Sequence, residues 1–192
     1  MDVIEPMDLV AQWLEEARKH LELPEAMTLA TVDRDGHPAA RMVIARRVDY
    51  EGVVFYTNME SAKADDIRTT GHAACVFYWA PLQRQVRITG VVEAVDDADA
   101  DAYFASRPPG SQLAAWASAQ SQPVSGRDAL ERQYAAVTER FAGGLVPRPP
   151  YWGGYRVVPD EVELWSGQPN RLHDRTRYQL SNGSWHTETL QP

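Results

Sequence analysis

The chain has 192 residues, of which 44% are hydrophobic and 24% charged, so its length and composition predict one folded domain rather than a disordered protein. Nineteen basic residues against 27 acidic ones give a formal net charge of −8. This charge argues against general binding to nucleic acid or to an anionic membrane, because both partners need a basic face. A small anionic ligand needs only a local basic pocket and is not excluded.

Cysteine usage and the terminal sequence bear on the compartment. Cys75 is the only cysteine, so an intrachain disulfide is excluded and a reducing, cytoplasmic location is expected. The first ten residues lack the basic and apolar regions of a signal peptide. The longest uncharged run, 108–126, is rich in Ser, Gln, Pro and Gly and is not expected to span a bilayer.

The expected elements begin with a helix over 7–23, whose apolar residues recur on one face. A strand meander follows, with strands over 27–33, 38–50 and 53–58 and turns at Asp35-Gly36 and Glu51-Gly52. Ser61 is a candidate N-cap for a short helix that stops at Gly71.

The second half of the chain mixes strands and helices. Strands are expected over 72–79 and 84–95, helices over 97–106, 111–119 and 125–141, and further strands over 155–165, 175–180 and 184–190. With these strands in mostly short connections, the pattern predicts an α+β protein whose mostly antiparallel sheet forms a barrel or half-closed barrel.

Several common motifs are missing from the sequence. It contains no GxGxxG fingerprint, no P-loop and no GxSxG nucleophile elbow. Its five histidines and one cysteine show no metal-ligand spacing, so no metal site is expected.

The placement of the cations is the less common feature. Only two of the basic residues, Lys19 and Lys63, are lysines. Arg41 and Arg46 lie in one predicted strand at odd spacing, so they point to opposite faces or are separated by a bulge. Lys63 lies at the start of a helix, where free N–H groups favour an anion. From spacing alone, solvated surface charges are the favoured interpretation of Arg41 and Lys63.

Two stretches of the sequence resemble the pyridoxine (pyridoxamine) 5′-phosphate oxidase family. The first is RQVRITGVVE (84–93) followed by YFASRPPGSQLAAWASAQSQ (103–122), and the second is WGGYRV…VELWSGQPNRLHDR (152–175). The resemblance runs from about residue 9 to 192. It implies one FMN-binding split β-barrel domain over 1–192, with its first helix over 7–23 and a closing segment over 152–192. It also implies a homodimer with the flavin at the subunit interface.

The same resemblance implies an activity and a set of cofactor contacts. Family members oxidise pyridoxine or pyridoxamine 5′-phosphate to pyridoxal 5′-phosphate, with O₂ as acceptor and release of H₂O₂. Arg41 is expected to hold the FMN phosphate together with Lys63, and Gln120 and Ser121 are expected to reach the flavin held mainly by the other subunit. The full set of implied FMN-binding residues is Arg41, Met42, Val43, Ile44, Arg46, Tyr56, Thr57, Lys63, Gln85, Gln120, Ser121, Trp165 and Arg175.

Substrate contacts are implied in the same way. The resemblance assigns the 5′-phosphate of the substrate to Tyr103, Arg107 and Ser111, together with Arg46, which replaces a family lysine. The Pro108-Pro109 pair predicts a helix break, so Ser111 is expected to join from the next helix. Arg171 and His173 are the implied catalytic residues over the substrate ring. Their alternation with Leu172 predicts that both face one side of an extended segment.

Other interpretations of these residues remain open from the sequence. Trp165, Tyr103 and His173 are residue types that commonly pack in a core, and Cys75 in an apolar run is expected to be buried. Ala62 stands where the family usually has an arginine, and a segment that covers the substrate in some members is not matched. The alternatives are therefore a related FMN-dependent oxidase of the phenazine-biosynthesis type that acts on another ring, or a non-catalytic flavin-binding protein.

Overall fold

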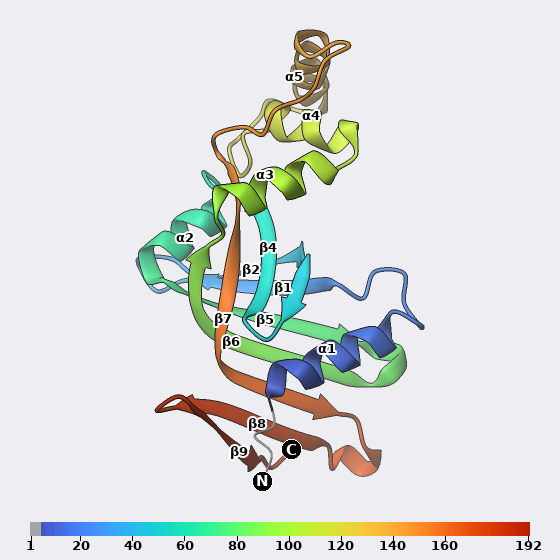
Figure 1. Ribbon diagram of the computed structural model, residues 1–192, viewed down its shortest axis with the longest axis vertical. Coiled ribbons are helices and arrows are strands. Elements are labelled where there is room, and N and C mark those ends of the chain that lie inside the picture. Colours follow the sequence, from blue (N-terminus) through green and yellow to red (C-terminus); the bar gives the residue numbers. More distant parts are fainter. Residues whose placement is uncertain (1–4) are drawn as a thin grey trace.

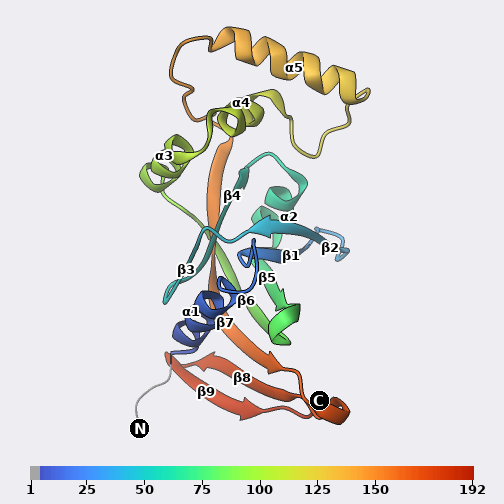
Figure 2. The ribbon, with the colours of Figure 1, turned by 90° about the vertical axis from the view of Figure 1, so that its right-hand side faces the viewer.

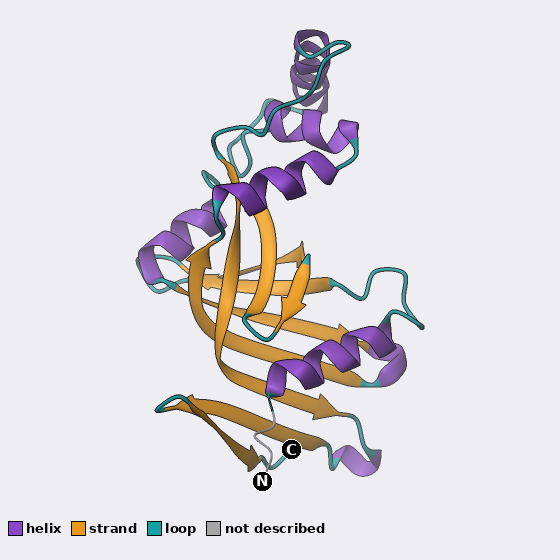
Figure 3. Ribbon diagram, in the orientation of Figure 1, coloured by secondary structure: helices purple, strands orange, loops and turns teal. Residues whose placement is uncertain are grey.

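The computed structural model describes residues 5–192 and contains five α-helices and one nine-stranded sheet (Figures 1 and 3). The helices are α1 (Pro6–Ala17), α2 (Ala62–Thr70), α3 (Asp97–Ser106), α4 (Pro109–Ala117) and α5 (Arg127–Arg140). The strands are β1 (Ala26–Val32), β2 (Pro38–Ile44), β3 (Arg47–Asp49), β4 (Gly52–Asn58), β5 (His72–Trp79), β6 (Arg84–Ala94), β7 (Trp152–Ser166), β8 (Asp174–Ser181) and β9 (Ser184–Thr189).

All strand pairs are antiparallel, in the order β2-β1-β5-β6-β7-β4-β3, with β8 on β7 and β9 on β8. The sheet curls into an open half-barrel, and α3, α4 and α5 gather beyond one end of it (Figure 2). The predicted α+β class with a mostly antiparallel split barrel is confirmed. Within the described range, no helix is both long and apolar enough to cross a membrane.

The core fills the inside of the curled sheet. Alternate residues of β5 and β6 point inward, so Phe77 and Ile88 are fully buried while their neighbours are not. Helix α1 covers this core with an apolar stripe that includes Val10 and Leu14. Cys75 is buried there, as the sequence predicted, and burial raises the pKa of its thiol to about 12.

Two local expectations are wrong. The first helix ends at Ala17 rather than near residue 23, because the backbone tightens into a turn in which the Lys19 N–H donates to Glu16 and the His20 N–H donates to Ala17. The expected strand over 38–50 is divided into β2 and β3. At the break, the Ala45 N–H donates to Glu25 and the Arg46 N–H donates to Val54, so the strand changes partners. This division adds one strand to the eight expected ranges, so the sheet has nine strands.

The 15-residue strand β7 is the longest element and joins the parts of the sheet. Its first half pairs with β4, its second half pairs with β8, and β6 runs along its length. Trp152 and Trp165 lie thirteen positions apart on it, so they are roughly 40 Å apart along the strand at about 3.3 Å per residue. Figures 1 and 2 show the two ends of β7 at α3–α4 and at β8–β9.

Substitution of Gly90 tests how tightly β6 and β7 approach each other. The register of the two strands shifts between Thr89 and Gly90, and a Cβ added to Gly90 would lie 1.8 Å from the Val158 carbonyl oxygen. Gly90→Ala should destabilise the protein by about 2 kcal/mol or more, which lowers Tm by roughly 4–8 °C. In the control Gly144→Ala, the nearest atom to the added Cβ is 3.8 Å away, so Tm should stay near that of the wild type. Equal Tm values for both variants would contradict this packing.

Candidate functional site

A cavity of about 420 Å³ lies where β2, β4, α3, α4 and the start of β7 meet. It is lined by Met42, Val43, Ile44, Arg46, Tyr56, Thr57, Asn58, Lys63, Tyr103, Arg107, Ala114, Ala115, Ser118, Gln120 and Trp152. Three cations and no carboxylate are among these described lining residues, although the whole chain carries a net charge of −8. The cavity is therefore suited to an anionic ligand.

Lys63 is a buried cation, and among residues 5–192 its ammonium contacts only neutral oxygens. Its Nζ donates to Gln120 Oε1 at 2.6 Å and to the hydroxyls of Thr57 and Ser61, each at 3.1 Å. Burial, together with the nearby positive charge of Arg41, lowers the pKa of Lys63 to about 8. Lys63 lies in the first turn of α2, where the helix dipole also favours an anion. A phosphate at this position would supply the negative counter-charge that the neutral oxygens around the ammonium do not provide.

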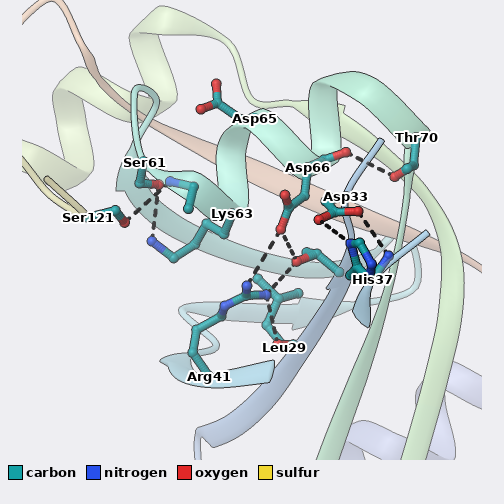
Figure 4. Close-up of polar contacts among 12 residues, drawn as sticks. Leu29, Asp33, His37, Arg41, Ser61, Lys63, Asp65, Asp66, Thr70 and Ser121 are labelled. Atoms are coloured by element: carbon teal, nitrogen blue, oxygen red, sulfur yellow. Dashed lines mark hydrogen bonds and ion pairs between the residues drawn. The ribbon is translucent and has the colours of Figure 1, made fainter. Parts of the chain in front are cut away.

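Arg41 is not among the cavity-lining residues, and Figure 4 shows its guanidinium directed toward Leu29 and Asp66 near Lys63. It donates to Thr31 Oγ1 at 2.6 Å and to the Leu29 carbonyl at 3.2 Å, and it lies 3.6 Å from the Asp66 carboxylate. Part of its charge is thus compensated by Asp66, and the rest contributes positive potential beside Lys63.

Gln120 and Ser121 lie in the loop after α4, and that loop folds back onto the start of α2. Gln120 contacts Lys63, as described above, and Ser121 Oγ accepts a 3.3 Å hydrogen bond from the Ala62 N–H (Figure 4). The sequence analysis expected this pair to reach the flavin held mainly by the other subunit, whereas the structure brings the pair to Lys63 of the same chain. A contact between residues 57 positions apart left no signal in the local sequence.

Two arginines approach the cavity over a stack of aromatic rings. The rings of Tyr56 and Tyr103 are stacked at 4.1 Å, and the nearly parallel Trp152 ring lies beside both, 5.4 Å from Tyr56 and 6.0 Å from Tyr103. Arg46 Cζ lies 5.6 Å from the Tyr103 ring centroid, and Arg107 Cζ lies 4.9 Å from that of Trp152.

Arg107 has unused binding capacity. Its Nη1 is buried and has no hydrogen-bond partner in the structure. Burial lowers the pKa of Arg107, and the neighbouring charge of Arg46 lowers it further. Because a buried guanidinium nitrogen without an acceptor is unfavourable, an anion at this point would stabilise it.

Helix α3 ends at Ser106 and α4 begins at Pro109, so the predicted break at the proline pair is confirmed. Ser111 lies in the first turn of α4, as expected, but it is not one of the cavity-lining residues. Trp152, which the sequence analysis left without a role, does line the cavity. Its signal was its place at the start of the WGGYRV stretch.

The remaining candidate residues gather at the opposite end of β7. Gln85, Trp165 and Arg175 lie side by side on β6, β7 and β8 in register. The His173 ring lies 4.6 Å from that of Trp165. Arg175 binds the buried carboxylate of Glu163 at 2.8 Å, and this carboxylate also binds Arg87.

The extended geometry expected for Arg171, Leu172 and His173 is wrong. Residues Pro169–Arg171 form a 3₁₀ turn, with positive φ angles of 58° at Asn170 and 62° at Arg171. Leu172 is 68% exposed and does not pack on the far side. The Gln168 N–H donates to His173 Nδ1 at 3.1 Å, which fixes the ring orientation. Turn geometry of this kind cannot be obtained from strand alternation.

Comparison with known proteins assigns the chain to a family. The profile described as pyridoxamine 5′-phosphate oxidase matches residues 14–141, and that described as pyridoxine 5′-phosphate oxidase C-terminal dimerisation region matches residues 152–192. The chain belongs to the pyridoxamine 5′-phosphate oxidase family. It is 50% identical over 189 residues to a Myxococcus xanthus relative named pyridoxine/pyridoxamine 5′-phosphate oxidase, covering 98% of this chain and 92% of that protein. A Synechocystis relative with the same name is 49% identical over 181 residues, or 94% of this chain and 85% of its own length.

Solved structures of the family share the fold. PhzG from Burkholderia lata 383, in complex with tetrahydrophenazine-1-carboxylic acid, superposes with a TM-score of 0.92 at 32% identity, covering 97% of this chain and 92% of that one. A pyridoxamine 5′-phosphate oxidase-related, FMN binding protein from Nostoc punctiforme has a TM-score of 0.77 at 20% identity and covers both chains fully. The second likeness supports the fold alone.

Lys63 gives the site a pH dependence that can be measured. The ammonium is charged below about pH 8, so anion binding at Lys63 should be strongest there and should weaken as pH rises. Above about pH 8, Lys63 must take up a proton before it can bind the anion. Its contribution to the phosphate affinity should therefore fall about tenfold by pH 9. Titration of the flavin-free protein with inorganic phosphate in a calorimeter would measure it. Lys63→Met should remove the pH-dependent part, whereas Lys19→Met, at the only other lysine, should retain it. A Lys63→Met profile identical to that of the wild type would refute the assignment.

Proposed function

We propose that this chain is an FMN-dependent oxidase that converts pyridoxamine or pyridoxine 5′-phosphate to pyridoxal 5′-phosphate, with O₂ as acceptor and H₂O₂ as product. The observation that carries the proposal is the cavity free of carboxylates, with Lys63 in one group of contacts and Arg46 with Arg107 in another. Two groups of cations suit two phosphates, one from the cofactor and one from the substrate. The names of the relatives at about 50% identity support the same substrate class.

The donor set around Lys63 fits the phosphate of FMN. The Lys63 ammonium, the Thr57 hydroxyl and the N–H groups at the start of α2 would bind the phosphate oxygens, with Arg41 adding positive potential nearby. Gln120 and Ser121 lie against the same helix start and would complete this part of the site. Met42, Val43, Ile44 and Tyr56 would lie along the rest of the cofactor. When bound, FMN would supply the hydride-acceptor chemistry and the route of the electrons to O₂.

The substrate phosphate would bind to the second group of cations. Arg107 offers a buried nitrogen with no present acceptor, and Arg46 lies close enough to lower its pKa. A phosphate dianion placed between the two guanidinium groups would relieve their mutual repulsion and accept charge-assisted hydrogen bonds. Tyr103 supports Arg46 through its ring, and Ser111 would contribute from the first turn of α4.

The cluster at the far end of β7, formed by Gln85, Trp165, His173 and Arg175, would act in the active site of a second copy of the chain. Trp152 in the cavity and Trp165 in that cluster are separated by almost the whole strand, so one chain cannot bring both to one flavin. The proposed active unit is therefore a homodimer in which Gln85, Trp165 and Arg175 reach the flavin held by the partner subunit. The match of residues 152–192 to a dimerisation region supports this arrangement.

Arg171 and His173 would be the catalytic residues of this cluster. Arg171 carries a positive charge that favours negative charge developing on the substrate ring. His173 accepts the Gln168 N–H at Nδ1, so its neutral ring holds the proton at Nε2. That proton would be donated to the oxygen of the substrate ring.

The alternative is an FMN-dependent oxidase acting on a phenazine-type ring, which the TM-score of 0.92 to PhzG supports. Oxygen uptake and peroxide release by the FMN-loaded protein separate the two. Pyridoxamine 5′-phosphate should be oxidised, and unphosphorylated pyridoxamine should react much more slowly because Arg46 and Arg107 lose their ligand. If the FMN-loaded protein oxidises neither phosphorylated vitamer, the proposal is wrong. Oxidation of a tetrahydrophenazine carboxylate instead would favour the alternative.

The assignment of Arg171 predicts a specific kinetic change. Arg171→Leu should lower kcat/KM for pyridoxamine 5′-phosphate at least about tenfold, a loss of ~1.4 kcal/mol of transition-state stabilisation. His173→Ala should have a smaller effect, since a hydrogen bond rather than a charge is removed. The control Leu172→Ala changes an exposed neighbour and should leave the kinetics unchanged. Steady-state kinetics on flavin-saturated variants test this, and wild-type kcat/KM in Arg171→Leu would defeat the assignment.

A further inference from the structure

Arg148 lies in the loop between α5 and β7, and its guanidinium contacts two separate elements. Nη2 lies 2.7 Å from Asp97 Oδ1, and Nε donates to Asp101, so both contacts are to the first part of α3. Nη1 donates to the carbonyl oxygen of Trp152, the first residue of β7, at 2.6 Å. The Arg148 side chain is only 16% exposed. A single side chain outside the cavity therefore joins α3 to the start of β7.

The two joined elements carry the proposed phosphate-binding side chains and their support. Helix α3 carries Tyr103 and is followed directly by Arg107, and β7 begins with Trp152. The Trp152 ring is the surface on which Arg107 lies, and it also packs edge-on against Phe104 at 5.0 Å. The buried Arg107 Nη1 has no hydrogen-bond partner that would hold the guanidinium in place. A shift of α3 relative to Trp152 would therefore move the guanidinium of Arg107.

The neighbouring residue ties the loop to the remaining helix of the cavity. The Pro147 carbonyl accepts a 2.7 Å hydrogen bond from the Trp116 indole of α4. Residues 147 and 148 thus contact α3, α4 and β7, which all contribute to the cavity lining. The other ion pair from α3 to the barrel, within residues 5–192, joins Asp99 to Arg47 at 2.8 Å.

We propose that Arg148 is a positioning residue for phosphate recognition, acting through α3 and Trp152 on Arg107; this rests on the proposed function of the cavity. The planar guanidinium suits the task because three nitrogens reach three oxygens that lie in different directions. A lysine keeps the charge, but its three donors share one nitrogen, which cannot occupy the separate positions from which Nε, Nη1 and Nη2 of Arg148 reach their oxygens. Since Asp97 and Asp101 are largely exposed, their ion pairs add little to global stability, and the Arg148→Lys variant should fold.

The test compares FMN-loaded wild type, Arg148→Lys and the control Arg127→Lys, whose arginine pairs with Glu131 within exposed α5. Arg148→Lys should weaken binding of inorganic phosphate and raise KM for pyridoxamine 5′-phosphate by about tenfold, as expected for a displaced binding group. Its kcat should stay within about twofold of wild type and its Tm within a few degrees. Arg127→Lys should match wild type in every measurement. Phosphate binding is measured without turnover. An inactive wild type would therefore refute the proposed function, and the Kd for inorganic phosphate would still test the role of Arg148.

A double-mutant cycle with Arg107→Lys separates positioning from a general structural role. If Arg148 acts through Arg107, adding Arg148→Lys to Arg107→Lys should weaken phosphate binding by less than about twofold further. The inference is overturned if Arg148→Lys alone leaves phosphate affinity unchanged, or if its full effect persists in the Arg107→Lys background.

Discussion

The length of β7 is the constraint on which the account of the site depends. One continuous strand carries Trp152 at the cavity and Trp165 beside His173, with roughly 40 Å of backbone between them. The two groups of candidate residues are therefore held rigidly apart within each chain. If both act on one flavin, a second chain must supply one of them, and the same strand that completes the barrel then determines which residues each subunit contributes.

The second constraint is the positive charge buried in the cavity, which favours the binding of anions at a cost to the stability of the ligand-free protein. Lys63 is buried among neutral oxygens, and Arg107 keeps a buried nitrogen without an acceptor. Both arrangements are unfavourable in the ligand-free protein, because buried cations lose hydration without gaining a carboxylate. Phosphate groups would restore what is missing at both points. The excess of acidic residues elsewhere leaves this cavity as a local site for anions, which is why the net charge of −8 did not exclude one.

The sequence predicted the parts of the fold that follow from local patterns. Alternation in β5 and β6, the stop of α2 at Gly71 and the break between α3 and α4 all depend on neighbouring residues. The partner change at Ala45–Arg46 depends instead on hydrogen bonds to Glu25 and Val54, which are distant in the sequence or on another strand. The 3₁₀ turn at Asn170–Arg171 and the return of Gln120 to Lys63 are tertiary in the same sense. The family resemblance identified the candidate site residues. Only the structure showed that they form two groups, one in the cavity and one at the far end of β7.

Mixed dimers test the central claim that the active site needs two chains. Arg107→Met alters the cavity group and Arg171→Leu alters the group beyond the far end of β7, so each variant alone should have little activity. Heterodimers that carry one chain of each, isolated with two different affinity tags, contain one site with both residues intact. They should recover about half of the wild-type oxidase activity per dimer, because one of two equivalent sites is restored. Heterodimers no more active than either variant alone would contradict the shared site.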